Sequence, residues 1–180
     1  IMTTDAYPKT CMYEVKLEDG KSFKIGAVAK GAGMINPNLA TMLCFICTDA
    51  AAPYADIMEA LRVNSETTFN AISVDGDTST NDTVMVLANA ASGAYDKDAF
   101  AEVLRVVMHD MAMLMVADGE GAKKVAAFEV INAASDEQAM IAAKALSNSL
   151  LVKTALFGED PNFGRIASTI GASRIDCDDE

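Results

Sequence analysis

The sequence contains no tryptophan and a single histidine, His109. A catalytic triad of the Ser-His-Asp kind would depend on this one residue. His109 lies in a segment with a helical pattern, away from every glycine-rich motif, so we expect an exposed or helix-capping side chain. Tetrahedral zinc sites draw their four ligands mainly from Cys and His. The sequence therefore gives little support to zinc chemistry or to a histidine-based triad.

Basic residues are also scarce, because 14 Lys and Arg stand against 26 Asp and Glu, giving a formal net charge of −12. Such a field repels phosphate backbones and anionic lipids, so we expect neither nucleic acid nor membrane as a partner. No apolar run approaches the roughly 20 residues that span a bilayer, and the opening residues lack the basic start of a signal peptide. We expect a cytoplasmic protein.

The few cysteines are Cys11, Cys44, Cys47 and Cys177. Cys44 and Cys47 have the Cys-x-x-Cys spacing of a redox or zinc pair. On a strand, however, residues three apart face opposite sides, so these two sulfur atoms would not share a metal. There is no second Cys-x-x-Cys pair. We interpret the cysteines as buried free thiols, which fits a reducing compartment.

What the sequence does contain is a mixture of strand and helix patterns. A hairpin is predicted over 11–17 and 22–28, around the turn Glu18-Asp19-Gly20. Further strands are predicted over 41–48, 72–74, 83–88 and 124–130. Helices are predicted over 54–63, 65–70, from Asp96 or Asp98 to 116, from the capping-box residue Ser135 to 147, and from 165 to 170. This mixture favours a layered α/β protein over a doubly wound parallel sheet.

The most informative stretch runs from Lys30 to Met42. A glycine-rich loop leads into Ala40 and Thr41, and the chain then becomes apolar and β-prone. A sharp turn there would bring the Thr41 hydroxyl onto the carbonyl carbon of Ala40, and strain of about 1–3 kcal/mol would help to break that peptide bond. The new N-terminal amine, with a reference pKa of about 7.7–8, would serve as base for its own hydroxyl.

Together with three other stretches, this loop is similar to the ornithine acetyltransferase (glutamate N-acetyltransferase, ArgJ) family. Four long motifs occur in the family's order and span nearly all 180 residues. The other three stretches are Ser73–Thr83, Asp118-Gly119-Glu120-Gly121-Ala122-Lys123, and Val152–Gly158 followed by Asp160-Pro161-Asn162-Phe163-Gly164-Arg165. Phe163 stands where the family often has Trp, which is a conservative exchange.

The resemblance implies which residues carry the chemistry. Family members cut themselves between Ala and Thr, here Ala40 and Thr41, and Thr41 then acts as nucleophile and contacts the substrate. Lys30, Thr4 and Glu120 match other substrate-contacting positions. A cation at Lys30 can hold a substrate carboxylate or lower the proton affinity of a neighbouring amine. A carboxylate at Glu120 can receive a charge-assisted hydrogen bond from a substrate ammonium group.

The activity implied is the ping-pong transfer of an acetyl group from N2-acetylornithine to glutamate in arginine biosynthesis, through an acetyl-threonine intermediate. No cofactor or metal is implied, and acetyl-CoA as an additional donor stays open. The α and β fragments of one precursor would form an α2β2 heterotetramer. The expected fold is a layered α-β-β-α arrangement of the DmpA/ArgJ type with mixed sheets, incomplete here at both ends.

The resemblance also divides the chain. Residues 1–40 match the C-terminal part of the α-chain, and residues 41–180 match the N-terminal part of the β-chain. The family's oxyanion hole is a Thr-Gly pair upstream of the matched part, and further substrate contacts follow the position of Glu180. We therefore expect the nucleophile and part of the pocket, but not a complete active site.

Two motif segments have no catalytic role assigned by the resemblance. Asp75 to Asp82 is too polar for a regular element and is a hallmark of the family, yet its residues have no individual roles. Arg165 and Asp160 are expected to pair and fix their turn. Two alternative functions remain open: an amidase or aminopeptidase of the same N-terminal-nucleophile superfamily, and a non-catalytic amino-acid-binding protein.

Overall fold

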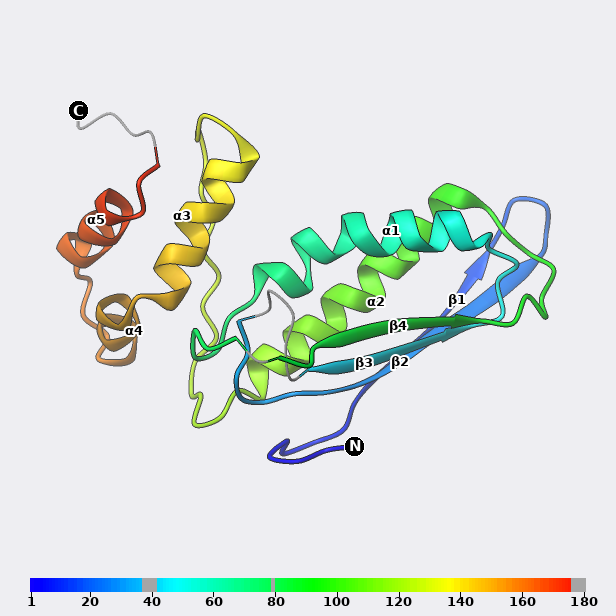
Figure 1. Ribbon diagram of the computed structural model, residues 1–180, viewed down its shortest axis with the longest axis horizontal. Coiled ribbons are helices and arrows are strands. Elements are labelled where there is room, and N and C mark those ends of the chain that lie inside the picture. The colour runs from blue at the N-terminus through cyan, green and yellow to red at the C-terminus, as the bar shows by residue number, and fades with distance from the viewer. Residues whose placement is uncertain (37–41, 79, 176–180) are drawn as a thin grey trace. The chain divides into compact units, whose positions relative to one another are not determined.

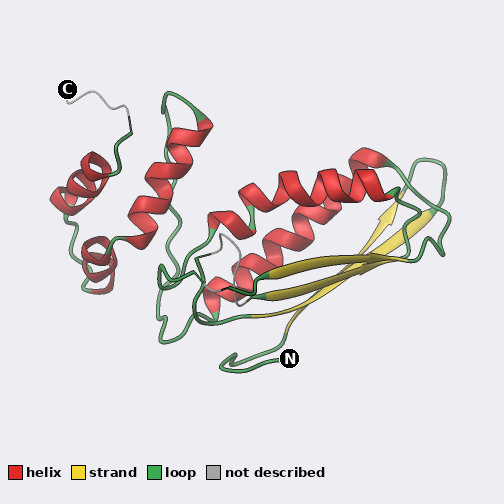
Figure 2. Cartoon of the chain, viewed as in Figure 1, coloured by secondary structure: helices red, strands yellow, loops and turns green. Residues whose placement is uncertain are grey.

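A computed structural model describes residues 1–36, 42–78 and 80–175 of the chain (Figure 1). The chain divides into two compact units, residues 1–122 and residues 123–180. The first unit contains every strand of the described residues, and the second contains three helices (Figure 2). The motifs around Thr41, Asp75 and Glu120 all fall in the first unit, which therefore holds the candidate site.

The first unit is built on a four-stranded mixed sheet in the order β1-β2-β3-β4. The hairpin of β1 (Lys9–Lys16) and β2 (Ser22–Lys30) forms as the alternating pattern predicts, because Gly20 takes the positive φ that the turn requires. Strand β3 (Leu43–Thr48) pairs antiparallel with β2, and β4 (Thr83–Ala88) pairs parallel with β3. The parallel pair is possible because a helical crossover connects the two strands.

Two helices cover one face of this sheet, as Figure 1 shows. Helix α1 (Tyr54–Thr67) and the 3-10 turn η1 (Phe69–Ala71) form the crossover between β3 and β4. Helix α2 (Lys97–Ala117) begins at Asp96, whose side chain accepts a hydrogen bond from Ala99 N. Its buried residues recur three and four positions apart, as on a helix with one face toward a core. The stripe that they form consists of Phe100, Val103, Leu104, Val107, Met108, Met111 and Met115.

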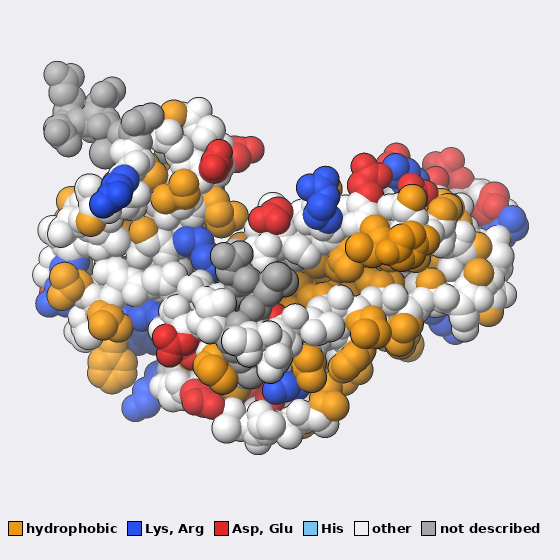
Figure 3. Space-filling view, in the orientation of Figure 1, with side chains coloured by type: hydrophobic (Ala, Val, Ile, Leu, Met, Phe, Trp, Pro, Cys, Tyr) orange, Lys and Arg blue, Asp and Glu red, His pale blue; other side chains and the backbone are white. Residues whose placement is uncertain are grey.

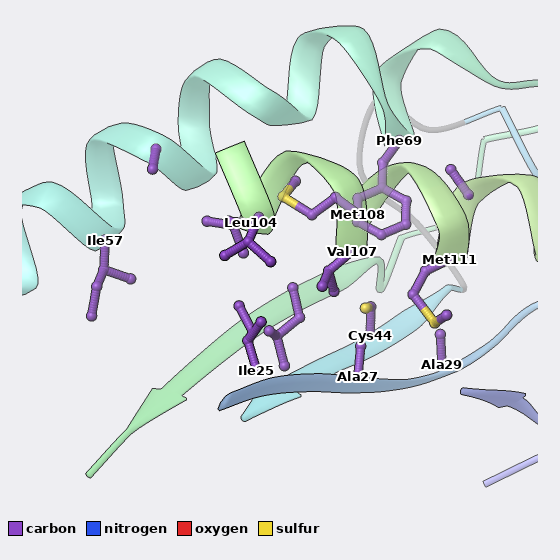
Figure 4. Close-up of a cluster of buried hydrophobic side chains, with 14 of the residues drawn as sticks. Ile25, Ala27, Ala29, Cys44, Ile57, Phe69, Leu104, Val107, Met108 and Met111 are labelled. Carbon is purple, nitrogen blue, oxygen red and sulfur yellow. The ribbon is translucent and has the colours of Figure 1, made fainter. Parts of the chain in front are cut away.

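The core lies between these helices and the inward-facing residues of the strands (Figure 4). Met111 points from α2 toward the sheet, beside Ala29, whereas Met108 extends toward α1. Methionine fills irregular space between helix and sheet well, since its unbranched side chain adapts to its neighbours. The buried methionines of α2, Met108, Met111 and Met115, therefore serve as packing residues.

The opposite face of the sheet carries exposed apolar side chains, including Met12, Val28, Met85 and Leu87. Figure 3 shows hydrophobic side chains along the strands of this unit. The mixed α/β class of the expected fold is confirmed, and the described residues hold one helical layer and one sheet layer of the layered arrangement.

The second unit consists of α3 (Asp136–Asn148), α4 (Leu150–Phe157) and α5 (Phe163–Ala172). The predicted Ser135 cap is confirmed, because its hydroxyl accepts from Gln138 N at 3.2 Å. In the described residues no single helix has the length and apolar character to cross a membrane; α3 and α4, bent by 61°, meet that test only as a pair.

Three predicted elements are wrong. Helix α1 continues to Thr67 instead of breaking near residue 64, because Asn64 is buried and its side-chain amide donates to Ala101 O. Residues 72–74 form no strand: Ile72 N donates to Phe69 O of the preceding 3-10 turn, and Val74 N donates to Ile35 O of the glycine-rich loop. Residues 124–130 are irregular and mostly exposed, because no described strand lies beside them to complete a ladder.

The core makes a direct prediction on α2. Met111→Ala removes a side chain with no exposed area and should lower the free energy of unfolding by about 2–5 kcal/mol, because buried methylene groups are lost and a cavity remains. Met113 lies on the same helix but is 41% exposed, so Met113→Ala should change stability by no more than about 0.5 kcal/mol. Urea denaturation of the whole protein measures both, and equal losses would contradict this packing.

Candidate active site

Three of the predicted substrate-contacting residues come from segments far apart in the sequence. Thr4 is exposed in the loop before β1, Lys30 is the partly buried last residue of β2, and Glu120 is exposed just after α2. Lys30 falls on the sheet face away from the helices, because Ile25, Ala27 and Ala29 point into the core on the alternate positions. The structure brings these three segments together at one end of the sheet.

The three segments meet on a buried ion cluster, which we call the Asp5–Lys9–Asp118 cluster. Lys9 Nζ lies 2.7 Å from Asp5 Oδ1 and also bonds to Asp118 Oδ2. The side chains of Lys9 and Asp5 have no exposed area, and that of Asp118 is 5% exposed. Buried charges need partners and hydrogen bonds. Here each charged group of the cluster has both.

The further side-chain hydrogen bonds of the cluster go to backbone amides near the candidate site residues. Asp5, which follows Thr4, accepts from Gly31 N at 2.7 Å, and Gly31 follows Lys30. Asp118, two residues before Glu120, accepts from Ala6 N at 3.0 and 3.2 Å. The cluster thus links the loop before β1, the end of β2 and the loop after α2.

Close backbone contacts bring Glu120 against the glycine-rich loop. Glu120 N donates to Ala32 O at 2.8 Å. A β-carbon at Gly33 would lie 2.9 Å from Glu120 Cδ, and one at Gly119 would lie 2.8 Å from Val74 Cγ1. Both distances are shorter than real β-carbon contacts, so glycine at these positions permits the carboxylate and the loops to approach.

The polar loop Ser73–Thr83 holds the chain on both sides of residues 37–41. Asp75 accepts from Met34 N at 2.6 Å and from Ile35 N at 3.1 Å. On the other side, Asp82 accepts from Met42 N, while Thr83 N donates to Met42 O at 2.9 Å. The sequence assigned no role to Asp75 or Asp82. In the structure, both side chains accept hydrogen bonds from backbone amides of the glycine-rich loop.

Other predictions have mixed outcomes. Ala40 and Thr41 lie outside the described residues. His109 is exposed, as predicted, with a side-chain exposure of 54%. Cys44 is buried and Cys47 exposed, so they do face opposite sides, but the prediction that Cys47 is buried is wrong. Cys177 also lies outside the described residues.

The predicted pairing of Arg165 with Asp160 is wrong. Arg165 instead donates to Leu151 O and Thr154 Oγ1, both at 2.8 Å. Asp160 accepts from the Asn162 side chain at 3.0 Å. Arg165 therefore ties α5 to α4 within the second unit, which remains a structural role.

Sequence reasoning missed Asp5, Lys9 and Asp118. The sequence did contain one indication of a buried Lys9. Lys9 occupies the same alternate positions of β1 as Cys11, Tyr13 and Val15, whose side chains pack against the core. A lysine on the inward face of a strand indicates a buried partner. Its partners were not identifiable, since Asp118 is 109 residues away in the chain.

Electrostatics in the cluster favour the ionised forms. Burial alone would raise the pKa of Asp5, but hydrogen bonds from Lys9, Gly31 and Thr3 and the charge of Lys9 outweigh it and lower that pKa to about 2. Burial would lower the pKa of Lys9, but its bonds to Asp118 and Asp5 raise that pKa above 10.5.

Within the described residues, no group of three or more His, Cys, Asp or Glu could hold a metal ion.

Comparison with known proteins identifies the family. The sequence profile of the ArgJ family matches residues 1–180, the whole of the chain. The chain belongs to the ArgJ family. The resemblance carried by the four motifs is thereby confirmed.

Individual relatives agree with this assignment. The chain is 63% identical over 179 residues to the arginine biosynthesis bifunctional protein ArgJ of Wolinella succinogenes, covering 99% of this chain and 45% of that protein. It is 49% identical over 180 residues to the glutamate N-acetyltransferase of Methanothermobacter thermautotrophicus, covering 100% of this chain and 44% of that protein. The chain thus spans a little under half the length of these curated relatives.

A solved structure shares the fold. The crystal structure of the arginine biosynthesis bifunctional protein ArgJ from Bacillus halodurans superposes with a TM-score of 0.75 at 41% sequence identity. The match covers 78% of this chain and 69% of that one.

The ArgJ-family site makes a prediction about pH. The pKa of Asp5 is about 2 in the folded protein, against 3.8 for an unperturbed carboxyl such as that of the unfolded chain. The contribution of Asp5 to stability is therefore complete above about pH 5 and is lost as the pH falls through about 4 to 2. Asp5→Asn removes this titration. Over that interval the unfolding free energy of the wild type should therefore fall more steeply than that of the variant, by at most about 1.4 kcal/mol per pH unit.

Urea denaturation at a series of pH values measures the difference between the two proteins. Asp77→Asn is a suitable control, because Asp77 is exposed and is not a member of the cluster. Parallel stability curves for wild type and Asp5→Asn would contradict the assignment.

Proposed function

We propose that the protein is a glutamate N-acetyltransferase that moves an acetyl group from N2-acetylornithine to glutamate through Thr41. One observation carries the proposal beyond family membership: one buried cluster holds the chain beside Thr4, Lys30 and Glu120. A β-carbon at Gly31, which is bonded to this cluster, would lie 3.1 Å from Ile35 Cδ1 and 3.4 Å from Met42 Cβ, on either side of the segment that contains Thr41. A cation and a carboxylate at one end of the sheet suit a substrate that carries both an α-carboxylate and an ammonium group.

The first reaction is self-cleavage. Thr41 Oγ attacks the carbonyl carbon of Ala40, the C–N bond to Thr41 breaks, and the nitrogen takes up a proton, leaving an ester. Water then hydrolyses the ester, giving a carboxylate on Ala40 and a free amine and hydroxyl on Thr41. This amine has a pKa near neutrality when unperturbed and can act as base for the adjacent hydroxyl.

The second reaction is acetyl transfer in two steps. Thr41 Oγ attacks the acetyl carbon of N2-acetylornithine, the amide C–N bond breaks, and ornithine leaves with the proton on its α-nitrogen. The α-amine of glutamate then attacks the acetyl-threonine ester, and the hydroxyl of Thr41 is restored. We assign the α-carboxylate of either substrate to Lys30 and the δ-ammonium group of N2-acetylornithine to Glu120, with Thr4 as a neighbouring polar contact. The α-amine of glutamate attacks in its neutral form.

The arrangement supports a partial site. Residues 1–40 would be the C-terminal part of an α-chain and residues 41–180 the N-terminal part of a β-chain. The oxyanion-hole donors, worth about 2.7–4 kcal/mol each, would come from outside this chain. The assembly would be an α2β2 heterotetramer located in the cytoplasm, and acetyl-CoA would be a second possible donor.

Self-cleavage gives the first functional prediction. The whole wild-type protein should separate into two fragments that meet between Ala40 and Thr41, and Thr41→Ala should remain one chain because it has no hydroxyl to attack the carbonyl. Intact mass spectrometry measures this directly. Transfer activity of the variant should fall at least about 10³-fold, as expected when a nucleophile is removed. A wild-type protein that is fully active with the Ala40–Thr41 bond intact would contradict the proposal.

The acceptor distinguishes the alternative functions. Incubation with N2-acetylornithine and glutamate should yield N-acetylglutamate and ornithine in equal amounts. An amidase would release free acetate even with glutamate present, and a binding protein would release neither product. Product analysis by mass spectrometry separates these outcomes.

The hydrogen bond from Met42 N to Asp82 gives a second prediction. Asp82→Ala removes the acceptor that fixes the residue following Thr41, and should slow self-cleavage at least about tenfold, because small misplacements of reacting groups are costly. Asp82→Asn keeps an oxygen acceptor and should cleave within about threefold of wild type. Intact mass against time measures both rates.

Asp77→Ala, in the same loop, serves as control and should cleave at the wild-type rate, since its exposed side chain is not bonded to Met42. Cleavage of Asp82→Ala at the wild-type rate would show that Asp82 does not position the junction.

A further inference from the structure

We infer that Lys9 is a positioning residue for the substrate pocket, holding Thr4, Lys30 and Glu120 in register through Asp5 and Asp118. The inference rests on the proposed function, and extends it to a residue that touches no substrate itself. Lys9 is fully buried on the inward face of β1, so it cannot act by direct contact with a ligand at the exposed Glu120.

The contacts of Lys9 differ from those of an ordinary stabilising ion pair. Its ammonium group bonds to Asp5 and Asp118 and lies 5.1 Å from the centroid of the Tyr7 ring. Tyr7 in turn donates to Leu114 O in the last turn of α2. A cation is favoured at a helix C-terminus, where the backbone carbonyls carry partial negative charge. Lys9 therefore joins the start of β1 to the end of α2.

Besides their bonds to Lys9, both carboxylates accept hydrogen bonds from backbone amides of the pocket segments. Asp5 accepts from Gly31 N and Thr3 N, so it fixes the chain on either side of Thr4 and immediately after Lys30. Asp118 accepts from Ala6 N and precedes Glu120 by two residues. The lysine is the only charged group that bonds to both carboxylates within the described residues.

Removal of the ammonium group would leave two carboxylates facing each other in a medium of low dielectric constant. Their repulsion would separate the loop before β1 from the loop after α2, and thereby Thr4 and Lys30 from Glu120. A shift of about 1 Å in a substrate-positioning group is enough to change rates by about 10²-fold. Because Lys30 and Glu120 hold opposite ends of an amino acid, the loss should fall mainly on substrate binding.

The test is Lys9→Met in the whole protein, which keeps the length of the side chain without its charge. KM for glutamate and for N2-acetylornithine should rise at least tenfold, and by a larger factor than kcat falls. Self-cleavage, followed by intact mass, should still go to completion, because Asp75 and Asp82 hold the junction independently of Lys9. Completed cleavage also reports that the variant has folded.

Lys97→Met is the matched control. Lys97 likewise bonds to two carboxylates of the same unit, at 2.8 Å to Glu59 and 3.4 Å to Asp56, but it lies on the surface between α1 and α2. Its KM values should stay within twofold of wild type. Unchanged KM values in a folded, cleaved Lys9→Met protein would overturn the inference, as would an equal rise in Lys97→Met.

Asp118→Asn covers the case in which Lys9→Met does not fold, because an amide oxygen still accepts from Ala6 N and from Lys9. Its KM values should rise at least threefold with cleavage intact, and unchanged values would overturn the inference.

If the wild type neither cleaves itself nor transfers acetyl groups, the proposed function has failed. Calorimetric binding of glutamate to wild type and to Lys9→Met then tests the positioning role alone. Equal affinities of the two proteins for glutamate would overturn the inference.

Discussion

The site depends on a lysine that is buried with two carboxylates. Taking such charges out of water costs several kcal/mol per ion, and breaking a buried pair by removing one partner typically costs about 3–5 kcal/mol. An apolar replacement of the whole set is often neutral or stabilising in proteins. The Asp5–Lys9–Asp118 cluster is therefore weak as a source of stability, and its value lies in fixing three loops to one another with directional bonds.

A second constraint explains why so many aspartates surround the glycine-rich loop. This loop has left the sheet, so its amides have no strand partner, and buried amides must be satisfied. Asp5, Asp75 and Asp82 accept from the amides of Gly31, of Met34 and Ile35, and of Met42, respectively. Three carboxylates thus replace the ladder that a strand would have supplied. Two of the three, Asp75 and Asp82, belong to the irregular family motif Ser73–Thr83.

Sequence reasoning succeeded where structure is local. The hairpin, the Asp96 and Ser135 caps, the buried stripe of α2 and strand β4 follow from periodicity and capping rules over a few residues. It failed where a distant partner decides: residues 124–130 have strand composition but no neighbouring strand, and Lys9 looks like a misplaced surface residue until Asp118 is beside it. Thr4, Lys30 and Glu120 were proposed from motif resemblance, since nothing local distinguishes them from surface residues.

The same bonds bear on what a cut between Ala40 and Thr41 would do. Strand β2 lies before that junction and β3 after it, and they pair antiparallel from Ile25 opposite Thr48 to Lys30 opposite Leu43. The ion cluster also crosses the junction, because Asp5 and Lys9 precede it and Asp118 follows it. Cleavage would therefore leave a threonine at a chain end while the sheet and the cluster still join the two pieces. A pocket formed by both pieces would therefore survive the cut, because the β2–β3 pairing and the ion cluster each join a residue before the junction to one after it.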